Sequence, residues 1–319
     1  MANEANESVM RINKPLVGTI FRIVIGLVFI LSAVLKYLSI EAVDLFFFDH
    51  KLLPWVVTTF ASRFLIAFEA LVGLMLVIGI YPKTTKVLTL TSLIGFTVYL
   101  FLKPLLFDVT QENCYCFGDI VQFSDTQTII KNILLLLMAL TLSWAKGWRP
   151  KFSKYILIGL VVITLGVCFT IKPPDFIQAK IYKHSVDIRP EVFELVKELD
   201  NVKALNVSQG RKVVGWYSTG CKYCKRAAKR IDIIIDRHNL DKEDFIEIFG
   251  GKEKPLTEFY QESGTKPLNN TFIPVIPFLN TTHGLMPVIF LLENGKVVKL
   301  YKLTTIDEEF IVDFLQNKN

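Results

Sequence analysis

Five long apolar stretches constrain the fold of this 319-residue chain more than any other feature. The hydrocarbon core of a bilayer is about 30 Å thick, and a helix needs roughly 20 residues to cross it. Stretches of that kind cover Leu16–Ile40, Phe64–Tyr81, Val87–Phe107, Thr126–Trp144 and Tyr155–Ile171. We therefore predict five transmembrane helices in contact with a lipid bilayer.

The segment Glu41–Ser62, between the first two spans, is rich in aromatic residues but is interrupted by Asp49 and Pro54. Such a segment is typical of an interfacial helix rather than of a sixth span. We expect Arg63, directly after it, to act as an interfacial anchor.

The short loops differ in charge. Basic residues gather at the N-terminus and after the second and fourth spans: Arg11, Lys14, Lys83, Lys86, Lys146, Arg149, Lys151 and Lys154. The intervening loops are mainly acidic. Because cytoplasmic loops carry the excess of Lys and Arg, we predict a multi-pass protein of a bacterial inner membrane. Its N-terminus would be cytoplasmic and its C-terminal domain periplasmic. The net charge of +6 is modest and indicates no nucleic-acid partner.

Charged residues become dense from Lys172 onward, where helix and strand patterns alternate. Asn294-Gly295 between two apolar runs predicts a β-hairpin, and Thr304 or Thr305 is the expected cap of the last helix. The predicted helices are Glu191–Leu199, Cys221–Arg237, Leu256–Glu262 and Ile306–Gln316, and the predicted strands are Lys212–Tyr217, Phe245–Phe249, Val288–Leu292 and Lys296–Tyr301.

Four of the five cysteines form close pairs, and one pair, Cys221-x-x-Cys224, lies at a strand-to-helix junction. A helix N-terminus favours the thiolate, so Cys221 is a candidate for the attacking thiol of a redox pair. The alternatives are a structural disulfide or half of a zinc site. His238 and His283 are only remote candidate ligands for zinc.

This pair and the dipeptide Met286-Pro287 before a predicted strand resemble thioredoxin-like oxidoreductases over roughly Glu191–Asn319. The resemblance implies a cis-proline, Pro287, beside the thiols, with Cys221 attacking and Cys224 resolving.

The basic residues that follow Cys221 divide into two groups. Lys222 and Lys225 are close enough in sequence to lower the thiol pKa, whereas a solvated face is expected for the others, Arg226, Lys229 and Arg230. The apolar stretch Thr271–Leu285 is either ordinary core and loop or a surface that docks on the membrane domain.

The membrane half contains Phe29–Lys36, Glu69-x-x-x-Gly73 and Cys114-x-Cys116-Phe-Gly118. Together these motifs resemble the DoxX-like MauE family over about Pro15–Gly147. The resemblance implies a four-helix membrane domain associated with periplasmic disulfide chemistry. A Cys-x-Cys pair closes only a strained ring, which is easily reduced. The alternative is a soft-metal site, for Cu(I) above all.

Three charged residues lie within or near the predicted spans. Glu69 inside the second span is either functional or a protonated acid hydrogen-bonded between helices. Lys36 and Lys103 either snorkel to the interface or stabilise a thiolate or a quinone head group. For the unpaired Cys168 we expect packing, with a relay thiol as the alternative.

The predicted fold is a membrane all-α domain, a four-helix bundle plus a fifth linking transmembrane helix, followed by an α/β thioredoxin-like domain. Its expected parts are residues 1–150, the fifth helix and linker at 151–190, and the periplasmic domain at 191–319.

The expected function is that of a membrane-bound thiol–disulfide oxidoreductase. It would relay electrons between Cys114/Cys116 and Cys221/Cys224 and act on periplasmic protein thiols. We expect no covalently bound cofactor and no metal. The layout is similar to that of bacterial vitamin K epoxide reductase homologues, which implies a quinone partner. The alternative is a non-catalytic maturation or assembly factor whose thioredoxin-like domain binds a client protein or Cu(I).

Overall fold

The computed structural model describes residues 13–50, 53–106, 115–121, 123–148, 150–175, 177 and 190–316. These residues form two compact units. One comprises residues 1–46 and 60–172, and the other comprises residues 47–59 and 173–319.

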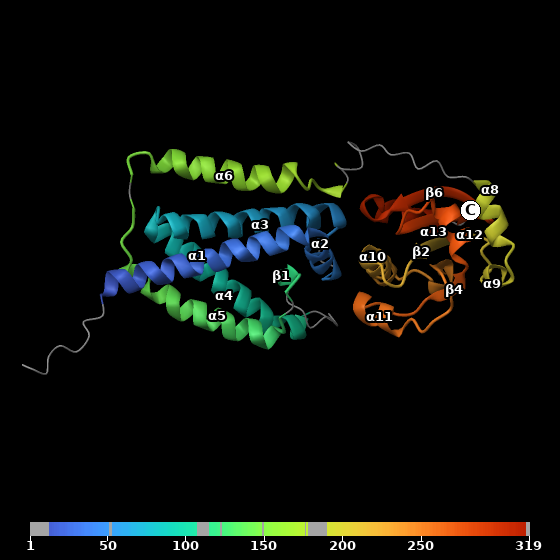
Figure 1. Ribbon diagram of the computed structural model, residues 1–319, viewed down its shortest axis with the longest axis horizontal. Coiled ribbons are helices and arrows are strands. Elements are labelled where there is room, and N and C mark those ends of the chain that lie inside the picture. Colours follow the sequence, from blue (N-terminus) through green and yellow to red (C-terminus); the bar gives the residue numbers. More distant parts are fainter. Residues whose placement is uncertain are drawn as a thin grey trace, which may run out of the picture. The chain divides into compact units, whose positions relative to one another are not determined.

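The first unit is built from long apolar helices (Figure 1). They are α1 (Lys14–Leu38), α3 (Trp55–Ile78, of which residues 55–59 belong to the second unit), α4 (Pro82–Leu106), α5 (Asp125–Leu140, extended by a 3₁₀ turn to Trp144) and α6 (Ser153–Thr170). Each is long and apolar enough to cross a membrane, which confirms the five predicted spans. The unit is therefore not a four-helix bundle, because α6 belongs to it as a fifth long helix.

The segment after α1 differs from its prediction. The short helix α2 (Ile40–Asp49) ends well before Ser62, and residues from Trp55 onward form the first turns of α3. Pro54 directly precedes that helix, where its missing N–H and fixed φ are tolerated. The proline therefore separates two helices and does not interrupt one.

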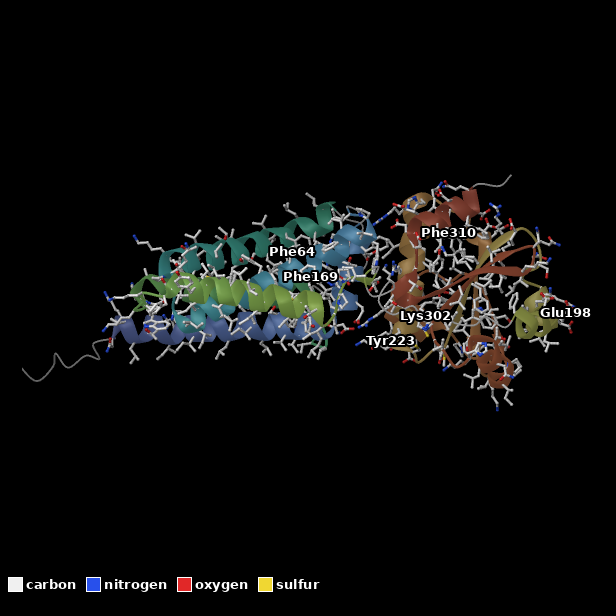
Figure 2. The ribbon with its side chains drawn as sticks, turned by 90° about the horizontal axis from the view of Figure 1, so that it is seen from above. Phe64, Phe169, Glu198, Tyr223, Lys302 and Phe310 are labelled. Atoms are coloured by element: carbon white, nitrogen blue, oxygen red, sulfur yellow. The ribbon has the colours of Figure 1, made fainter. Side chains whose placement is uncertain are left out.

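Packing within the first unit brings α6 against α1 and α3. The hydroxyl of Tyr37 on α1 donates to the carbonyl of Val167, 3.2 Å away. Phe64 on α3 and Phe169 on α6 pack edge to face with ring centroids 5.2 Å apart (Figure 2). Cys168 is buried and free in the same small cluster, in agreement with a packing role.

Helices α1 and α3 approach closely where two glycines face each other. A Cβ added to Gly73 would lie 2.9 Å from the carbonyl oxygen of Gly26, and the reverse distance is also 2.9 Å. Small residues at a membrane helix crossing allow the backbones to come together in this way. The crossing lies one helical turn from Glu69.

One end of the bundle gathers the end of α1, the start of α5 and the short strand β1 (Cys116–Asp119). The N–H of Asp119 donates to Ser39 Oγ over 3.2 Å. The chain leaves the unit at this same end, because Arg63 Nε donates to the carbonyl of Lys172 over 3.0 Å and Lys172 Nζ donates to the carbonyl of Leu38 over 3.2 Å. The opposite end is basic, where Arg22 donates to the carbonyl of Lys146 over 3.1 Å.

The second unit contains a five-stranded mixed sheet in the order β4-β3-β2-β5-β6. The strands are β2 (Arg211–Tyr217), β3 (Phe245–Gly250), β4 (Asn269–Ile273), β5 (Val288–Glu293) and β6 (Lys296–Lys302). Strands β2, β3 and β4 run parallel, whereas β5 pairs antiparallel with both β2 and β6. Asn294 and Gly295 both have positive φ in the hairpin turn, as the predicted turn type requires.

Helices cover both faces of this sheet. On one face, Trp216 packs with Phe193 of α8 (Pro190–Lys197) and Phe278 of α12 (Val275–Thr282). On the other face, Tyr217 stacks on Phe259 of α11 (Thr257–Ser263). Helices α10 (Lys222–His238) and α13 (Glu308–Gln316) also contact β2. The unit is an α/β domain.

Besides the short helix α9 (Asp200–Lys203), two elements of this domain were not predicted, namely β4 and α12. Together they account for most of Thr271–Leu285, where Phe278 is core but Ile276 is exposed. The expected cap of α13 was also wrong. Asp307 Oδ1 accepts the N–H of Phe310 over 3.1 Å, whereas Thr305 closes the preceding turn onto Lys302.

Candidate functional site

Cys221 and Cys224 lie where β2 passes into α10. Cys221 is the N-cap residue, and its sulfur accepts the N–H of Cys224 over 3.2 Å. The sulfur of Cys224 is fully buried and accepts the N–H of Ser218 over 3.5 Å. Both thiols are free. The first cysteine is thus the accessible one of the pair, and the second is held beneath it.

The two thiols have opposite electrostatic surroundings. The hydrogen bond from Cys224 lowers the pKa of Cys221 to about 6, with further support from the N–H groups of Cys224 and Tyr223 and from the charge of Lys225, against the opposing effect of burial. The same hydrogen bond and burial raise the pKa of Cys224 far above its usual range. At neutral pH Cys221 is therefore a thiolate and Cys224 a thiol, the pairing needed for nucleophilic attack followed by resolution.

The basic residues of α10 do not form the expected solvated face. Lys225 forms an ion pair with Glu262 of α11, but Arg226, Lys229 and Arg230 are all buried. Lys229 donates to the carbonyl of Gly264 over 3.1 Å, and Arg230 donates to the carbonyls of Leu303 and Ile306. Lys229 Nζ also lies 3.2 Å from Asp49 Oδ1, and Arg230 Nη1 lies 3.4 Å from Asp175 Oδ2. The solvated-face prediction was therefore wrong.

The peptide bond between Met286 and Pro287 is cis and lies directly before β5, as the thioredoxin resemblance implies. Strand β5 is the antiparallel neighbour of β2, which ends at the two cysteines. Within the described ranges, no group of three or more His, Cys, Asp or Glu side chains is arranged to hold a metal ion.

A buried carboxylate, Glu247 on β3, was not singled out from the sequence. It accepts a hydrogen bond from the Tyr260 hydroxyl over 2.7 Å. Burial raises the pKa of Glu247 to about 7, against the lowering effect of that hydrogen bond and with a further increase from Asp232. An acidic residue within a strand of alternating pattern normally indicates a solvent-facing position, which is why no sequence signal marked it.

Cys116 in the first unit is disulfide-bonded, and its neighbour Cys114 lies outside the described residues. The carbonyl of Cys116 accepts a hydrogen bond from Ser32 Oγ over 2.7 Å, and its sulfur lies 3.6 Å from Thr128 Oγ1. Both partners are buried hydroxyls on transmembrane helices, α1 and α5. The cysteine is therefore packed into the end of the bundle.

Lys36 and Glu69 meet inside the bundle. Their Nζ and Oε1 atoms are 2.5 Å apart, and only 8% of the lysine side chain and 18% of the glutamate side chain are exposed. Lys36 Nζ also donates to Ser32 Oγ over 3.1 Å, which links the pair to Cys116. The snorkelling alternative for Lys36 was therefore wrong, and the glutamate has a cationic partner.

Lys103 does not join this network. It is buried and pairs instead with Asp125 at the start of α5, with Nζ and Oδ2 3.0 Å apart. Arg63 is likewise no interfacial anchor, because it is 2% exposed and its Nη1 lies 3.1 Å from Asp44 Oδ2. Both cations lie at the end of the bundle that holds β1, and each forms an ion pair there.

A small cavity of about 60 Å³ lies beside Cys116. Its polar lining includes Ser32, Lys36, Glu69, Lys131 and Asn132. Lys131 and Asn132 were missed because the sequence places them in the second turn of a span, where polar residues are common near the interface. Only the packing of α5 against α1 and α4 brings them to Cys116.

The part of the chain that holds this cysteine and these buried charges is similar to a known family. Residues 14–145 match the family described as Methylamine utilisation protein MauE. That part of the predicted resemblance is confirmed, and the matched segment includes Lys36, Glu69, Lys103 and Cys116.

A relative is similar over both units. The chain is 24% identical over 349 residues to Protein TlpB of Flavobacterium psychrophilum, and the match covers 92% of this chain and 93% of that protein. The chain thus consists of a MauE-like membrane module followed by an α/β domain.

Proposed function

We propose that the chain is a membrane-bound thiol–disulfide oxidoreductase. Residues 190–316 would act as its thioredoxin-like domain. The observation that carries the proposal is the asymmetric pair at the start of α10, where Cys221 has a pKa of about 6 and Cys224 is a buried thiol. The cysteines of a structural disulfide do not ionise, so a stabilised thiolate does not fit that role. Both cysteines are also free. A low-pKa thiol at a helix N-terminus is typical of reactive cysteines.

The second half of the proposed reaction uses Cys114 and Cys116. The Cys221 thiolate would attack the disulfide that contains Cys116, forming a mixed disulfide and releasing one thiolate from that disulfide. The Cys224 thiol, losing its proton, would then attack Cys221 and free the second sulfur. Two electrons pass from the Cys221/Cys224 dithiol to the Cys116 disulfide, and the reverse sequence carries them back.

Support for a relay within one chain comes from the first unit alone. Lys172, at the exit from the bundle, lies at the same end as β1. The chain thus continues into the α/β domain from the end that holds Cys116. The opposite end carries the basic loops, so the positive-inside rule assigns the end with Cys116 to the periplasmic side in this proposal.

The outer partners of the relay would be periplasmic protein thiols at Cys221 and a quinone at the membrane module. The cavity beside Cys116 measures about 60 Å³, whereas a protein cavity known to bind benzene measures about 150 Å³. In our proposal a quinone therefore approaches the disulfide from the lipid-facing surface. Lys36 and Glu69 then act on Cys116 and not on the quinone ring.

The deciding experiment is disulfide trapping in cells with Cys224→Ser, which removes the resolving thiol. We expect a Cys221 crosslink to Cys114 or Cys116, and separate crosslinks to periplasmic proteins. The matched control is Cys221→Ser with Cys224→Ser, which should abolish both. When Cys114→Ser and Cys116→Ser are added to the Cys224→Ser variant, only the internal crosslink should disappear.

The outcomes separate the candidate functions. External crosslinks without an internal one would exclude the relay and leave an oxidoreductase without it. Neither kind of crosslink would favour the alternative, a maturation or assembly factor that binds a client protein or Cu(I) without turnover.

A further inference from the structure

The cavity beside Cys116 has an unbalanced charge. Three of its lining residues are ionisable: Lys36, Glu69 and Lys131. Lys36 and Glu69 form an ion pair and cancel. The ammonium group of Lys131 leaves a net charge of +1 in a space enclosed by transmembrane helices, where an uncompensated charge is costly.

Lys131 lies next to the cysteine segment. Its Nζ is 4.5 Å from the ring centroid of Phe117, the residue after Cys116. Among the residues that the structure describes, it makes no salt bridge, unlike the other two bundle lysines near this end, Lys36 and Lys103. The half-buried Lys131 side chain therefore has an aromatic face and a cavity around it, but no paired anion.

Among the described residues, the other charged side chains near this end do not supply the missing negative charge to the cavity. Lys103 and Asp125 compensate each other between α4 and α5. Asp119 lies at the far end of β1, where its N–H is bound to Ser39, and it does not line the cavity. Cys116 does line it, and a cysteine becomes an anion when it is reduced and deprotonated.

We propose that Lys131 stabilises the thiolate of Cys116 when the disulfide of Cys116 is opened. The inference rests on the proposed function, because it assigns the charge partner of a thiolate formed in the relay. With the disulfide closed, the cavity carries one positive charge. With the thiolate present, it is neutral.

In the exchange step, the Cys221 thiolate attacks the sulfur bonded to Cys116. A new disulfide bond to Cys221 forms, the old bond breaks, and Cys116 leaves with the electron pair. Lys131 bears the compensating charge at that moment. Thr128 Oγ1 lies 3.6 Å from the sulfur, but its hydroxyl donates to the carbonyl of Ser124 over 3.0 Å. In the reverse direction the same charge keeps Cys116 ready to attack.

The test measures the ionisation of Cys116 in the full chain reconstituted in lipid nanodiscs. Cys114, Cys168, Cys221 and Cys224 are replaced by Ser, so that Cys116 is the remaining thiol. Methyl methanethiosulfonate converts the thiolate to a methyl disulfide and releases methanesulfinate, and mass spectrometry follows this modification from pH 5 to pH 10. The midpoint of the pH profile reports the thiolate and is independent of how easily the reagent enters.

The charge that each substitution removes should determine whether the midpoint for Cys116 rises or falls. Lys131→Met should raise the midpoint by about one pH unit or more, a tenfold loss of thiolate at neutral pH. Lys131→Arg, which keeps the charge, should leave it nearly unchanged, and Glu69→Gln should lower it. Lys83→Met, at an exposed position at the opposite end of the bundle, is the matched control and should have no effect.

An unchanged midpoint in Lys131→Met would overturn the inference. So would shifts of the same sign in Lys131→Met and Glu69→Gln, since these would indicate general disruption of the bundle. Because this chain lacks Cys221, the result is separate from the trapping experiment. The relay can fail while the midpoint shifts, and the midpoint can stay constant while the relay holds.

Discussion

Lys36 Nζ and Glu69 Oε1 lie 2.5 Å apart although the two residues are 33 positions apart in the chain. Helices α1 and α3 bring them together, and Ser32 connects them to the carbonyl of Cys116. Ser32 Oγ can donate its single proton to either the glutamate or that carbonyl. The ion pair thus belongs to the same network as the cysteine segment, and breaking it affects both stability and the site.

Removing only one member of the Lys36–Glu69 pair should lower the free energy of unfolding more than removing both. Lys36→Met leaves a carboxylate without its cation inside the bundle, and we expect a loss of about 3 kcal/mol in the free energy of unfolding. The double variant with Glu69→Met should recover most of this loss. Equilibrium unfolding in mixed detergent micelles measures both, and equal losses in the single and double variants would contradict the prediction.

The pKa of Cys221 should depend on the hydrogen bond from Cys224. Cys224→Ala removes this donor, so we expect the midpoint for alkylation of Cys221 to rise above the wild-type value of about 6. Cys224→Ser keeps a hydroxyl donor and should raise it less. Mass spectrometry of the Cys221 peptide across pH gives the comparison. A midpoint that stays near 6 in the alanine variant would assign the effect to the backbone N–H groups and Lys225 instead.

Glu247 should make the α/β domain less stable as pH rises. Burial raises its pKa to about 7 in the folded state from an ordinary value of 4.5, so the folded state binds the proton more tightly. The stabilisation from the proton on Glu247 is complete below about pH 4.5 and is lost between about pH 4.5 and 7. Above that range the free energy of unfolding stays at the lower value. The difference of 2.5 pH units corresponds to about 3 kcal/mol.

Glu247→Gln tests this, because the amide cannot ionise but can still accept from Tyr260. We expect it to match the wild type at pH 4.5 and to exceed its stability by up to about 3 kcal/mol at pH 8. Hydrogen exchange of the β3 amides in the full chain measures the difference. Parallel pH profiles for the two proteins would show that Glu247 is not the responsible group.

The close crossing of α1 and α3 should not tolerate a methyl group. Gly73→Ala would place a Cβ 2.9 Å from the Gly26 carbonyl oxygen, so the helices must separate and the Lys36–Glu69 pair must lengthen. We expect a lower thermal midpoint. Gly95 on α4 has no atom within 4 Å of the same added carbon, and Gly95→Ala should be neutral or stabilising. Similar losses for both variants would contradict the packing argument.

Much of the fold was predictable because its signals are local. The five spans follow from about 20 consecutive apolar residues each, and the hairpin follows from Asn294-Gly295. The Cys221 position follows from a strand pattern directly before a helix. The strand β4 and helix α12 were missed because each is short, and Pro274 between them indicates a loop.

The candidate site was less predictable because it is assembled from distant residues. Lys36 and Glu69 could each be recognised as unusual within a span, but their pairing depends on the α1–α3 crossing at Gly26 and Gly73. Lys131 carries no such signal. The buried Arg230 was misread for a related reason, since the carbonyls that bind it come from residues more than 70 positions away.

The exit of the chain from the bundle at the end that holds β1 has a kinetic consequence for the proposed relay. Two dithiols tethered in one polypeptide meet by an intramolecular encounter, with an effective concentration in the millimolar range for short linkers. The exchange rate would then be the same whether the membrane holds few copies or many. External thiols would compete with it only at comparable concentrations. Separating the two units into different chains would make the same reaction depend on expression level.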